Sequence, residues 1–194
     1  TTELICCSRY VERGVREHFP WFHGATSVVY NGVDVEAVAA RSAPTRNSST
    51  LPRPYRVGMV ARLEPSKDHD TLLDAVALAA REVDLELWIV GDGSRRAELE
   101  ARTSAAGLGS RIRFLGSRRD VPEVLGQLDA FVFSVKPDEG LGLALIEAMA
   151  AGLPIVATDV GACREVLGDP PTGTLVPYRD SRAMADALIR VAHA

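Results

Sequence analysis

Two glutamates, Glu139 and Glu147, lie eight positions apart and flank Gly140-Leu-Gly142 and an apolar run. The apolar stretch 130–134 predicts a buried strand before them, and the alanines, leucines and isoleucine after Gly142 favour a helix. Glu139 therefore belongs to a strand-to-helix loop, and Glu147 lies about one and a half turns into the helix. Free amides of a first helical turn suit a phosphate, and the two carboxylates suit hydroxyls of a sugar and a ribose. Alone, this spacing more often marks solvated glutamates and turn glycines.

Two cations, Arg62 and Lys67, follow another predicted strand at 55–61. Because Arg62 comes directly after this strand, its side chain emerges at the strand's carboxyl end. Lys67 comes after the turn Glu64-Pro-Ser66. Two cations at this place can neutralise a diphosphate leaving group, on which charge builds as the sugar–phosphate bond breaks. Either residue alone would more often be a solvated surface charge, but together with the 139–147 segment they indicate a nucleotide-sugar site.

Apolar strand-like segments alternate with helical ones along most of the chain. Strands are predicted at 3–7, 27–30, 55–61, 85–90, 111–115, 130–134, 154–158 and 174–176. Helices are predicted at 9–18, 69–81, 95–106, 121–127, 142–150, 162–167 and 182–193. Apolar strands separated by helices of about ten residues indicate βαβ units. The predicted fold class is α/β, a Rossmann-like parallel sheet with helices on both faces, which binds ligands at the carboxyl edge.

Composition limits the class of protein. The 194 residues carry a net charge of −4 without a basic block, which argues against a nucleic-acid partner. Apolar runs are strand-length or interrupted by charge, and the first residues lack the features of a signal peptide. Three cysteines cannot make a disulfide framework, so Cys6 and Cys7 are predicted to be small buried residues of a cytoplasmic protein. The histidines share no ligand spacing, and His69 is expected to make a loop contact.

Several short motifs occur in an order that is jointly specific. They are Val57-Gly-Met-Val-Ala-Arg-Leu-Glu-Pro-Ser-Lys67, Leu87-Trp-Ile-Val-Gly-Asp-Gly93, Ile112-Arg-Phe-Leu-Gly116, the paired-glutamate segment, Gly152-Leu-Pro-Ile-Val-Ala-Thr158 and Gly173-Thr-Leu-Val-Pro177. From about 27 to 188, the chain resembles the donor-binding domain of retaining GT-B glycosyltransferases of the family 4 type (glycosyl transferases group 1). The resemblance implies that the predicted sheet is one lobe of a GT-B fold.

The resemblance also implies a division of the chain. Residues 1–33 would be the last strand–helix–strand unit of the amino-terminal, acceptor-side lobe together with the hinge. Residues 34–194 would be the carboxyl-terminal domain that binds the nucleotide-sugar donor, with a truncated carboxyl terminus. The polar, proline-rich segment 42–54 is predicted to be a flexible linker or long loop. We expect one lobe of a longer enzyme. A stand-alone protein whose partner chain supplies the other lobe is the alternative.

The resemblance assigns roles to the residues of the site. Arg62 and Lys67 would bind the diphosphate and, with Glu139, form the catalytic set. Glu139 would bind hydroxyls of the transferred sugar, and Glu147 those of the ribose. Backbone amides would contact the donor at Gly140, Leu141, Gly142 and Leu143. Two positions depart from the family pattern, since Ala61 replaces a usual glycine and Leu141 replaces a frequent aromatic residue.

A second group of residues is expected to contact the nucleoside part of the donor. Gly91, Asp92 and Gly93 end a predicted buried strand and open a helix, a suitable place for a phosphate or base loop, although Asp-Gly is also ordinary turn chemistry. By resemblance, Leu115, Arg118 and Val121 would line the base pocket. Asp159 and Glu165 are expected to be solvated or helix-capping.

The resemblance implies transfer of a sugar from a UDP-sugar or GDP-sugar donor to an acceptor, with retention at the anomeric carbon. No DxD-type carboxylate pair stands out, so no metal or other cofactor is expected, and the two cations would do the charge work of a divalent metal. The acceptor would bind mainly to the missing lobe. The full-length enzyme would be cytoplasmic, with possible peripheral association with the inner face of the membrane. A non-catalytic nucleotide-sugar-binding subunit and a GT-B-type epimerase or phosphorylase are the alternatives.

Overall fold

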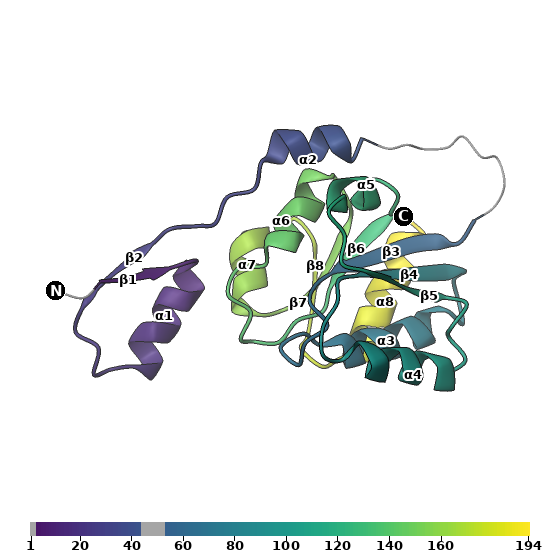
Figure 1. Ribbon diagram of the computed structural model, residues 1–194, viewed down its shortest axis with the longest axis horizontal. Helices are drawn as coiled ribbons and strands as arrows, with labels where there is room; N and C mark the ends of the chain where they lie inside the picture. Colours follow the sequence, from purple (N-terminus) through teal and green to yellow (C-terminus); the bar gives the residue numbers. More distant parts are fainter. Residues whose placement is uncertain (1–2, 44–52) are drawn as a thin grey trace.

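The computed structural model describes residues 3–43 and 53–194 (Figure 1). Its strands are β1 (Glu3–Cys6), β2 (Ala25–Val28), β3 (Tyr55–Val60), β4 (Leu85–Val90), β5 (Ile112–Gly116), β6 (Ala130–Phe133), β7 (Ile155–Thr158) and β8 (Thr174–Val176). Its helices are α1 (Arg9–His18), α2 (Val35–Arg41), α3 (His69–Ala79), α4 (Arg96–Ala105), α5 (Val121–Leu125), α6 (Leu143–Ala150), α7 (Gly161–Leu167) and α8 (Ser181–Ala192).

Six parallel strands form the main sheet, in the order β5-β4-β3-β6-β7-β8. The chain adds β4 and β5 on one side of β3, then returns and adds β6, β7 and β8 on the other side. β3 and β6 pair directly, with Val57 beside Ala130 and Gly58 beside Phe131. The strand order therefore reverses between β3 and β6. In open α/β sheets, such a reversal leaves a crevice at the carboxyl ends of the two strands, where ligands bind.

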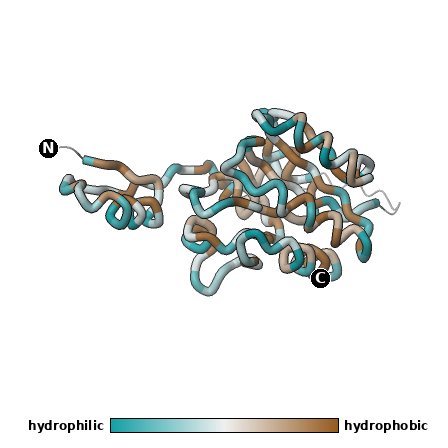
Figure 2. Tube along the Cα trace, turned by 90° about the horizontal axis from the view of Figure 1, so that it is seen from below, coloured by the Kyte–Doolittle hydropathy of each residue, from teal (hydrophilic) through white to brown (hydrophobic). Residues whose placement is uncertain are grey.

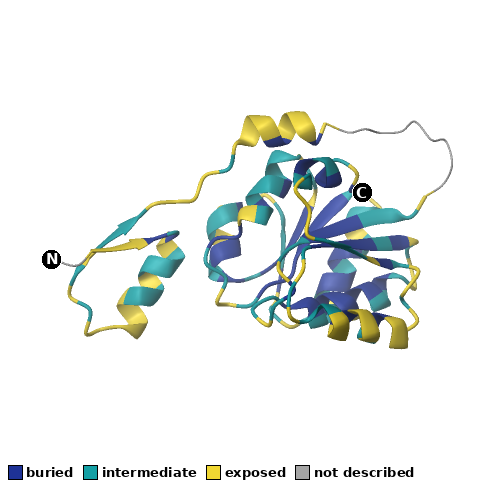
Figure 3. Ribbon diagram, in the orientation of Figure 1, coloured by how far each residue is buried: buried dark blue, intermediate teal, exposed yellow. Residues whose placement is uncertain are grey.

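Helices cover both faces of the main sheet. Figure 1 shows α3, α4 and α8 on one side and α5 and α6 on the other, with α7 beside α6. Figure 3 shows that the central strands are buried, whereas α2 and the outer faces of the helices are exposed. The most hydrophobic segments likewise run through the interior of this body (Figure 2). Burial of both sheet faces explains why the strands are mostly apolar, with one charged residue in each of β3, β4 and β5. The predicted α/β Rossmann-like fold is confirmed.

All eight predicted strands form, and their ends shift by at most two residues. One helix was not predicted, α2, which begins where the Asp34 carboxylate accepts a hydrogen bond from the Ala37 amide at 2.9 Å. Most of the predicted linker, 44–52, lies outside the described residues. The first residue of the predicted linker, Ser42, is instead part of the fold: it is buried at the end of α2, where its carbonyl packs against Gly126. The proximity of these two residues explains why a glycine occupies position 126.

β1, α1 and β2 form an amino-terminal unit, in which two parallel strands pair from Glu3 with Ala25 to Cys6 with Val28. In Figure 1 this unit lies at the end of the molecule nearest α7. Residues 29–34 connect it to α2. The two-stranded and six-stranded sheets are separate, and the predicted boundary between 33 and 34 remains a prediction.

Candidate functional site

A cavity of about 490 Å³ lies at the carboxyl ends of β3 and β6. Its walls come from three segments: the loop after β3, the loop between β6 and α6, and two residues of the amino-terminal part of the chain. The lining residues are Cys7, Asn31, Val60, Ala61, Arg62, Lys67, Phe133, Glu139, Gly140, Leu141, Gly142, Leu143 and Ala144. Both cations, Glu139 and the predicted amide segment Gly140 to Leu143 thus share one cavity at the expected edge of the sheet.

Arg62 reaches the cavity because the residues on either side of it are tied to β4. The Ala61 amide donates to Val90 O and the Leu63 amide to Asp92 O, both at 3.0 Å. Leu63 is fully buried and anchors the loop, whereas Arg62 is exposed. Within the described residues, the Arg62 guanidinium makes no hydrogen bond or ion pair. A free cation in a concave site is suited to an anionic ligand.

The close contact between the loop after β3 and the loop after β4 depends on Gly91. Its φ is 138°, and a Cβ at this position would lie 1.9 Å from Ala61 O. Only glycine has both the backbone freedom and the space that this requires. Gly91 therefore keeps the loop after β4 close to the loop that carries Arg62.

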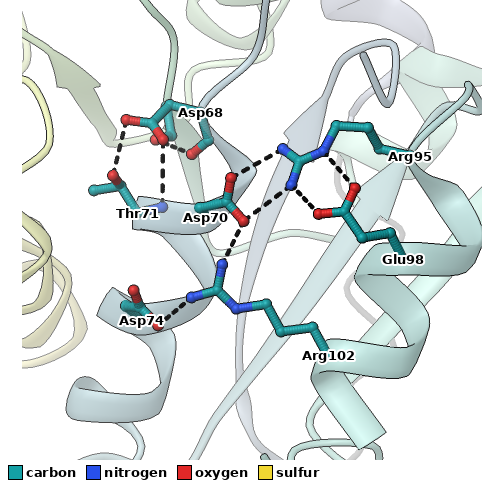
Figure 4. Close-up of polar contacts among 8 residues, drawn as sticks. Asp68, Asp70, Thr71, Asp74, Arg95, Glu98 and Arg102 are labelled. Atoms are coloured by element: carbon teal, nitrogen blue, oxygen red, sulfur yellow. Dashed lines mark hydrogen bonds and ion pairs between the residues drawn. The ribbon is translucent and has the colours of Figure 1, made fainter. Parts of the chain in front are cut away.

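Lys67 is positioned by pairing with the end of β6. It forms an antiparallel bridge with Val135, the Asp68 amide donates to Ser134 O at 3.1 Å, and Ser134 Oγ donates to Asp68 O at 2.7 Å. The buried Asp68 side chain then begins α3 and accepts hydrogen bonds from Thr71 (Figure 4). These contacts place the lysine between the two strands at which the strand order reverses.

An ion-pair network holds the first turns of α3 against α4. Figure 4 shows Asp70 between the guanidinium groups of Arg95 and Arg102, while Arg102 also reaches Asp74, with 2.6 Å between the charged atoms. The hydrogen bond from Arg95 lowers the pKa of the Asp70 carboxyl below its usual range. The network lies one turn or more beyond Lys67, and we interpret it as support for the helix that follows the lysine.

The Lys67 ammonium and the Glu139 carboxylate form an ion pair across the cavity. The side chains are only 15% and 11% exposed, and the ammonium lies 5.9 Å from the centre of the Phe133 ring. This pair satisfies the lysine charge in the free chain. A phosphate would compete with Glu139 for the lysine, whereas Arg62 is already available.

The loop from β6 to α6 ends at Gly142, whose φ of 84° is left-handed. A Cβ there would lie 2.9 Å from the Phe133 ring, so glycine is required. No side chain caps α6, and in the described residues the amides of Leu143 and Ala144 donate no hydrogen bond. Free first-turn amides are the expected anion-binding feature.

Glu147 does not line the cavity. It lies on α6 one turn beyond Leu143 and on the same helix face, about 6 Å further along the axis. The side chain is half-buried without a hydrogen-bond partner in the described residues, and burial raises the pKa of its carboxyl. A half-buried, unpaired carboxyl suits a ligand group that donates hydrogen bonds.

The residues predicted to bind the nucleoside lie outside this cavity. The Asp92 carboxylate accepts from the Gly93 amide at 2.8 Å and from Arg96 at 3.0 Å, so its charge is already compensated. Arg118 makes a two-pronged ion pair with Asp120, beside Val121 at the start of α5. Leu115 lies in β5, two strands from β3. α4 begins at Arg96, one residue after the predicted start of this helix at 95.

Two sequence predictions were wrong. Cys7 was expected to be buried, but it is only half-buried, lies beyond the end of β1 and lines the cavity. His69 begins α3, as the predicted helix 69–81 requires, but it is fully buried instead of making the expected loop contact. Neither of its ring nitrogens has a partner in the described residues, and burial lowers its pKa to about 4. The strand-like run around Cys6 gave no signal for where the strand ends, and the histidine lies in an ordinary amphipathic pattern.

Sequence reasoning also missed Asn31 and the contacts of the amino-terminal unit with the cavity. Glu165 was expected to be solvated or helix-capping, and it does cap a helix, α1, by accepting hydrogen bonds from the Arg9 and Tyr10 amides. Because α1 is more than a hundred residues away in the chain, no local pattern could have identified it.

A second, mostly apolar hollow of about 480 Å³ lies beside the first and shares Leu141. It is lined by Tyr30, Val35, Leu141, Ile146, Met149, Ala150, Glu165 and Val166. Its lining includes no cation, so the first cavity is better suited to an anionic ligand. In 3–43 and 53–194, no group of three or more histidine, cysteine, aspartate or glutamate side chains is arranged to hold a metal ion. No helix in these ranges combines the length and apolar character needed to cross a bilayer.

Known proteins similar to this chain are glycosyltransferases. The phosphatidyl-myo-inositol mannosyltransferase of Mycolicibacterium smegmatis is 40% identical over 166 residues, 83% of this chain and 41% of the relative. The GDP-mannose-dependent alpha-mannosyltransferase of Mycobacterium tuberculosis is 33% identical over 171 residues, 84% of this chain and 41% of the relative. The chain therefore spans about two fifths of the length of these relatives.

Among solved structures, HepE of Anabaena in complex with UDP and glucose matches with a TM-score of 0.80 and 26% identity. The match covers 97% of this chain and 53% of HepE, so it includes the amino-terminal unit as well as the main sheet. The family model described as glycosyl transferases group 1 matches residues 54–194, the part that contains the whole six-stranded sheet. This chain belongs to the glycosyl transferases group 1 family.

Proposed function

We propose that this chain is the donor-binding lobe of a retaining glycosyltransferase that transfers mannose from GDP-mannose. The observation that carries the proposal is the shared cavity, in which Arg62, Lys67, Glu139 and the free amides of α6 converge. A diphosphate needs cations and amide donors, and a sugar needs a carboxylate acceptor for its hydroxyls. The cavity offers all of these within one space of about 490 Å³.

In this proposal, the diphosphate binds between Arg62 and the first turn of α6. Arg62 has no competing partner in the described residues, and the Leu143 and Ala144 amides are free. Lys67 joins the diphosphate when the phosphate displaces Glu139 from the ion pair. The released Glu139 carboxylate then accepts hydrogen bonds from hydroxyls of the sugar. The existing ion pair thus becomes two ligand contacts, and neither charge is left unpaired.

Glu147 is the proposed ribose ligand. Its position one helical turn beyond Leu143 places it further from the sugar end of the donor than Glu139. The order along the chain then follows the order of the donor's parts. The sugar is nearest Glu139, the diphosphate is at the amides of α6, and the ribose is at Glu147. Gly91, Asp92, Gly93, Leu115, Arg118 and Val121 remain proposed contacts for the nucleoside part.

The proposed chemistry is a front-face displacement. The bond from the anomeric carbon to the phosphate oxygen breaks while the bond to the acceptor oxygen forms on the same face. The departing phosphate oxygen takes the acceptor's proton, so no protein carboxylate has to act as nucleophile. Arg62, Lys67 and the amides stabilise the charge that develops on the diphosphate. We propose that they do so without a divalent metal.

The mannose assignment rests on similarity. The two mannosyltransferases are 40% and 33% identical to this chain, and HepE, solved with UDP and glucose, is 26% identical. UDP-glucose is therefore the competing donor. We further propose that acceptor contacts come mainly from the acceptor-side lobe, and that the whole enzyme works in the cytoplasm, peripherally attached to the inner face of the membrane.

A thermal-shift panel of GDP, UDP, ADP, GDP-mannose and UDP-glucose tests the donor. A true ligand at a hundredfold excess over Kd stabilises by about 2.7 kcal/mol. We expect GDP and GDP-mannose to raise the melting temperature of this chain, with and without EDTA. A shift with UDP and UDP-glucose alone would move the assignment to a glucosyl donor. No shift with any nucleotide would refute the proposed function.

A further inference from the structure

Ser8, at the start of α1, uses one hydroxyl group for two hydrogen bonds. Its oxygen accepts from the Val11 amide at 3.1 Å and thereby caps α1, and its O–H donates to Gly140 O at 2.6 Å. The side chain is 0% exposed, so water cannot replace either bond. The second bond joins the amino-terminal unit to the loop that carries Glu139.

The backbone at Gly140 is in direct contact with the first turn of α1. A Cβ on Gly140 would lie 3.2 Å from Cys7 Sγ and 3.6 Å from a Val11 methyl carbon. A Cβ at this position would need the Cys7 sulfur to move by a few tenths of an ångström, and it would also contact the Val11 side chain on α1. The absence of a side chain at Gly140 allows the short bond from Ser8.

Tyr10 makes a second bond to the same loop. Its phenol donates to Pro137 O at 2.5 Å, and its ring packs on Gly161, where a Cβ would lie 2.1 Å from a ring carbon. Glu165 fixes the start of α1 by accepting from the Arg9 and Tyr10 amides at 2.8 and 2.7 Å. The helix that carries Ser8 and Tyr10 is thus itself held on α7.

The bond from Ser8 determines the direction of one amide in the cavity wall. In a trans peptide, the carbonyl and the following N–H point in opposite directions. With Gly140 O held toward α1, the Leu141 N–H is directed away from α1. This amide donates no hydrogen bond within the described residues, and Leu141 lines the cavity.

We propose that Ser8 and Tyr10 are positioning residues for donor binding. They hold the carbonyls of Gly140 and Pro137, and so present Glu139 and the Leu141 amide to the diphosphate-sugar. This inference rests on the proposed function, because it concerns the same cavity. It adds that Ser8 and Tyr10 of the amino-terminal unit help to build the donor site although neither side chain lines the cavity.

The test compares variants that separate the two roles of Ser8. Ser8→Gly removes the bond to Gly140 but keeps a residue that caps helices almost as well as serine. Ser8→Thr restores the hydroxyl. Tyr10→Phe removes only the bond to Pro137. Asp180→Ala is the matched control. It removes the cap of α8, in which the Ala183 amide donates to the Asp180 carboxylate at 2.8 Å, and this residue does not line the cavity.

Calorimetry with GDP and UDP, and with guanosine and uridine, is the measurement, and melting temperature is recorded for each variant. We expect Ser8→Gly and Tyr10→Phe to bind the diphosphate roughly 3- to 10-fold more weakly, the scale of one hydrogen bond. Nucleoside binding should stay unchanged, and Ser8→Thr should recover diphosphate binding. Asp180→Ala should lower the melting temperature without a change in Kd.

Two results would overturn the inference while leaving the proposed function intact. The first is diphosphate binding at the original strength by both Ser8→Gly and Tyr10→Phe. The second is an equal loss in Asp180→Ala, which would assign the effect to general stability. Failure of the original chain to bind any of the four ligands would refute both the proposed function and this inference.

Discussion

Lys67 and Glu139 form an ion pair although they are 72 residues apart in the chain. Lys67 lies on the loop after β3 and Glu139 on the loop after β6, and these strands are neighbours at the point where the strand order reverses. The Glu139 carboxylate is therefore paired with the cation that we propose for the diphosphate. Removing the negative charge of Glu139 should therefore strengthen binding of the nucleoside diphosphate and weaken binding of the nucleotide-sugar.

Glu139→Gln should bind the nucleoside diphosphate more tightly, because it leaves the mostly buried Lys67 charge without a partner until a phosphate binds. Binding of the nucleotide-sugar should weaken by about 1.5–3 kcal/mol, because the sugar hydroxyls lose a charged acceptor. Calorimetry with GDP and GDP-mannose measures both changes. Asp138→Asn is the matched control, since this exposed neighbour does not line the cavity. Weakening of GDP by Glu139→Gln would show that the carboxylate does not compete for the lysine.

Arg62→Ala should weaken binding of the nucleoside diphosphate by roughly 1–3 kcal/mol, the scale of charge-assisted hydrogen bonds. Nucleoside binding should change little, because the lost contacts belong to the phosphates. Arg81→Ala removes the same charge from an exposed position near the end of α3 and should leave binding unchanged. Equal losses for nucleoside and diphosphate would place Arg62 elsewhere in the complex.

The sequence predicted the sheet well because its strands are buried on both faces. The buried strand β6 reads as an uninterrupted apolar run, and β4 is interrupted only by Glu86; glycine and turn residues mark the strand ends. Arg62, Lys67 and Glu139 could be placed together because parallel strands have their carboxyl ends at one edge of the sheet. The helix α2 was missed because its short, mostly exposed sequence carries little apolar periodicity.

Contacts between distant segments could not be predicted. Ser8 and Tyr10 contact the 137–142 loop, and Glu165 contacts α1, only because the amino-terminal unit packs there. In its local sequence, each of these residues is an ordinary cap or surface residue. The Lys67–Glu139 ion pair could not be predicted from the sequence either. The sequence indicated that both residues belong to one site, but not that they neutralise each other in the free chain.

Glu147→Gln should weaken GDP and GDP-mannose equally, by about 1.5–3 kcal/mol, since the ribose is common to both. It should also stabilise the free chain. Burial raises the pKa of Glu147 above its ordinary value of 4.5, so ionisation of this carboxyl opposes folding. The destabilisation is absent below pH 4.5 and develops as the pH rises through the raised pKa.

Urea unfolding of Glu147→Gln at neutral pH and at pH 4 measures the stability effect. The free energy of unfolding should be larger for the variant than for the original chain at neutral pH, and this difference should shrink at pH 4. Glu82→Gln serves as the control, because this glutamate is exposed just beyond the end of α3 and its side chain has no hydrogen bond or ion pair within the described residues. A loss of GDP-mannose binding alone, with GDP unaffected, would mean that the donor lies in the reverse direction along α6.

His69 should make the stability of the fold depend on pH between about 4 and 6.5. Its pKa is about 4 in the folded chain, where the ring is buried and has no hydrogen-bond partner among the described residues, and its ordinary value is 6.5. Because the unfolded chain binds the proton more tightly, stability is full above pH 6.5 and falls as the pH drops toward 4. The pKa difference corresponds to a loss of about 3 kcal/mol over this window.

His69→Leu, which fills a similar volume without a titrating ring, should flatten this part of the urea-unfolding profile. His23→Gln, at an exposed position, should retain the full slope. A slope of the original size in His69→Leu would assign the acid sensitivity to other groups.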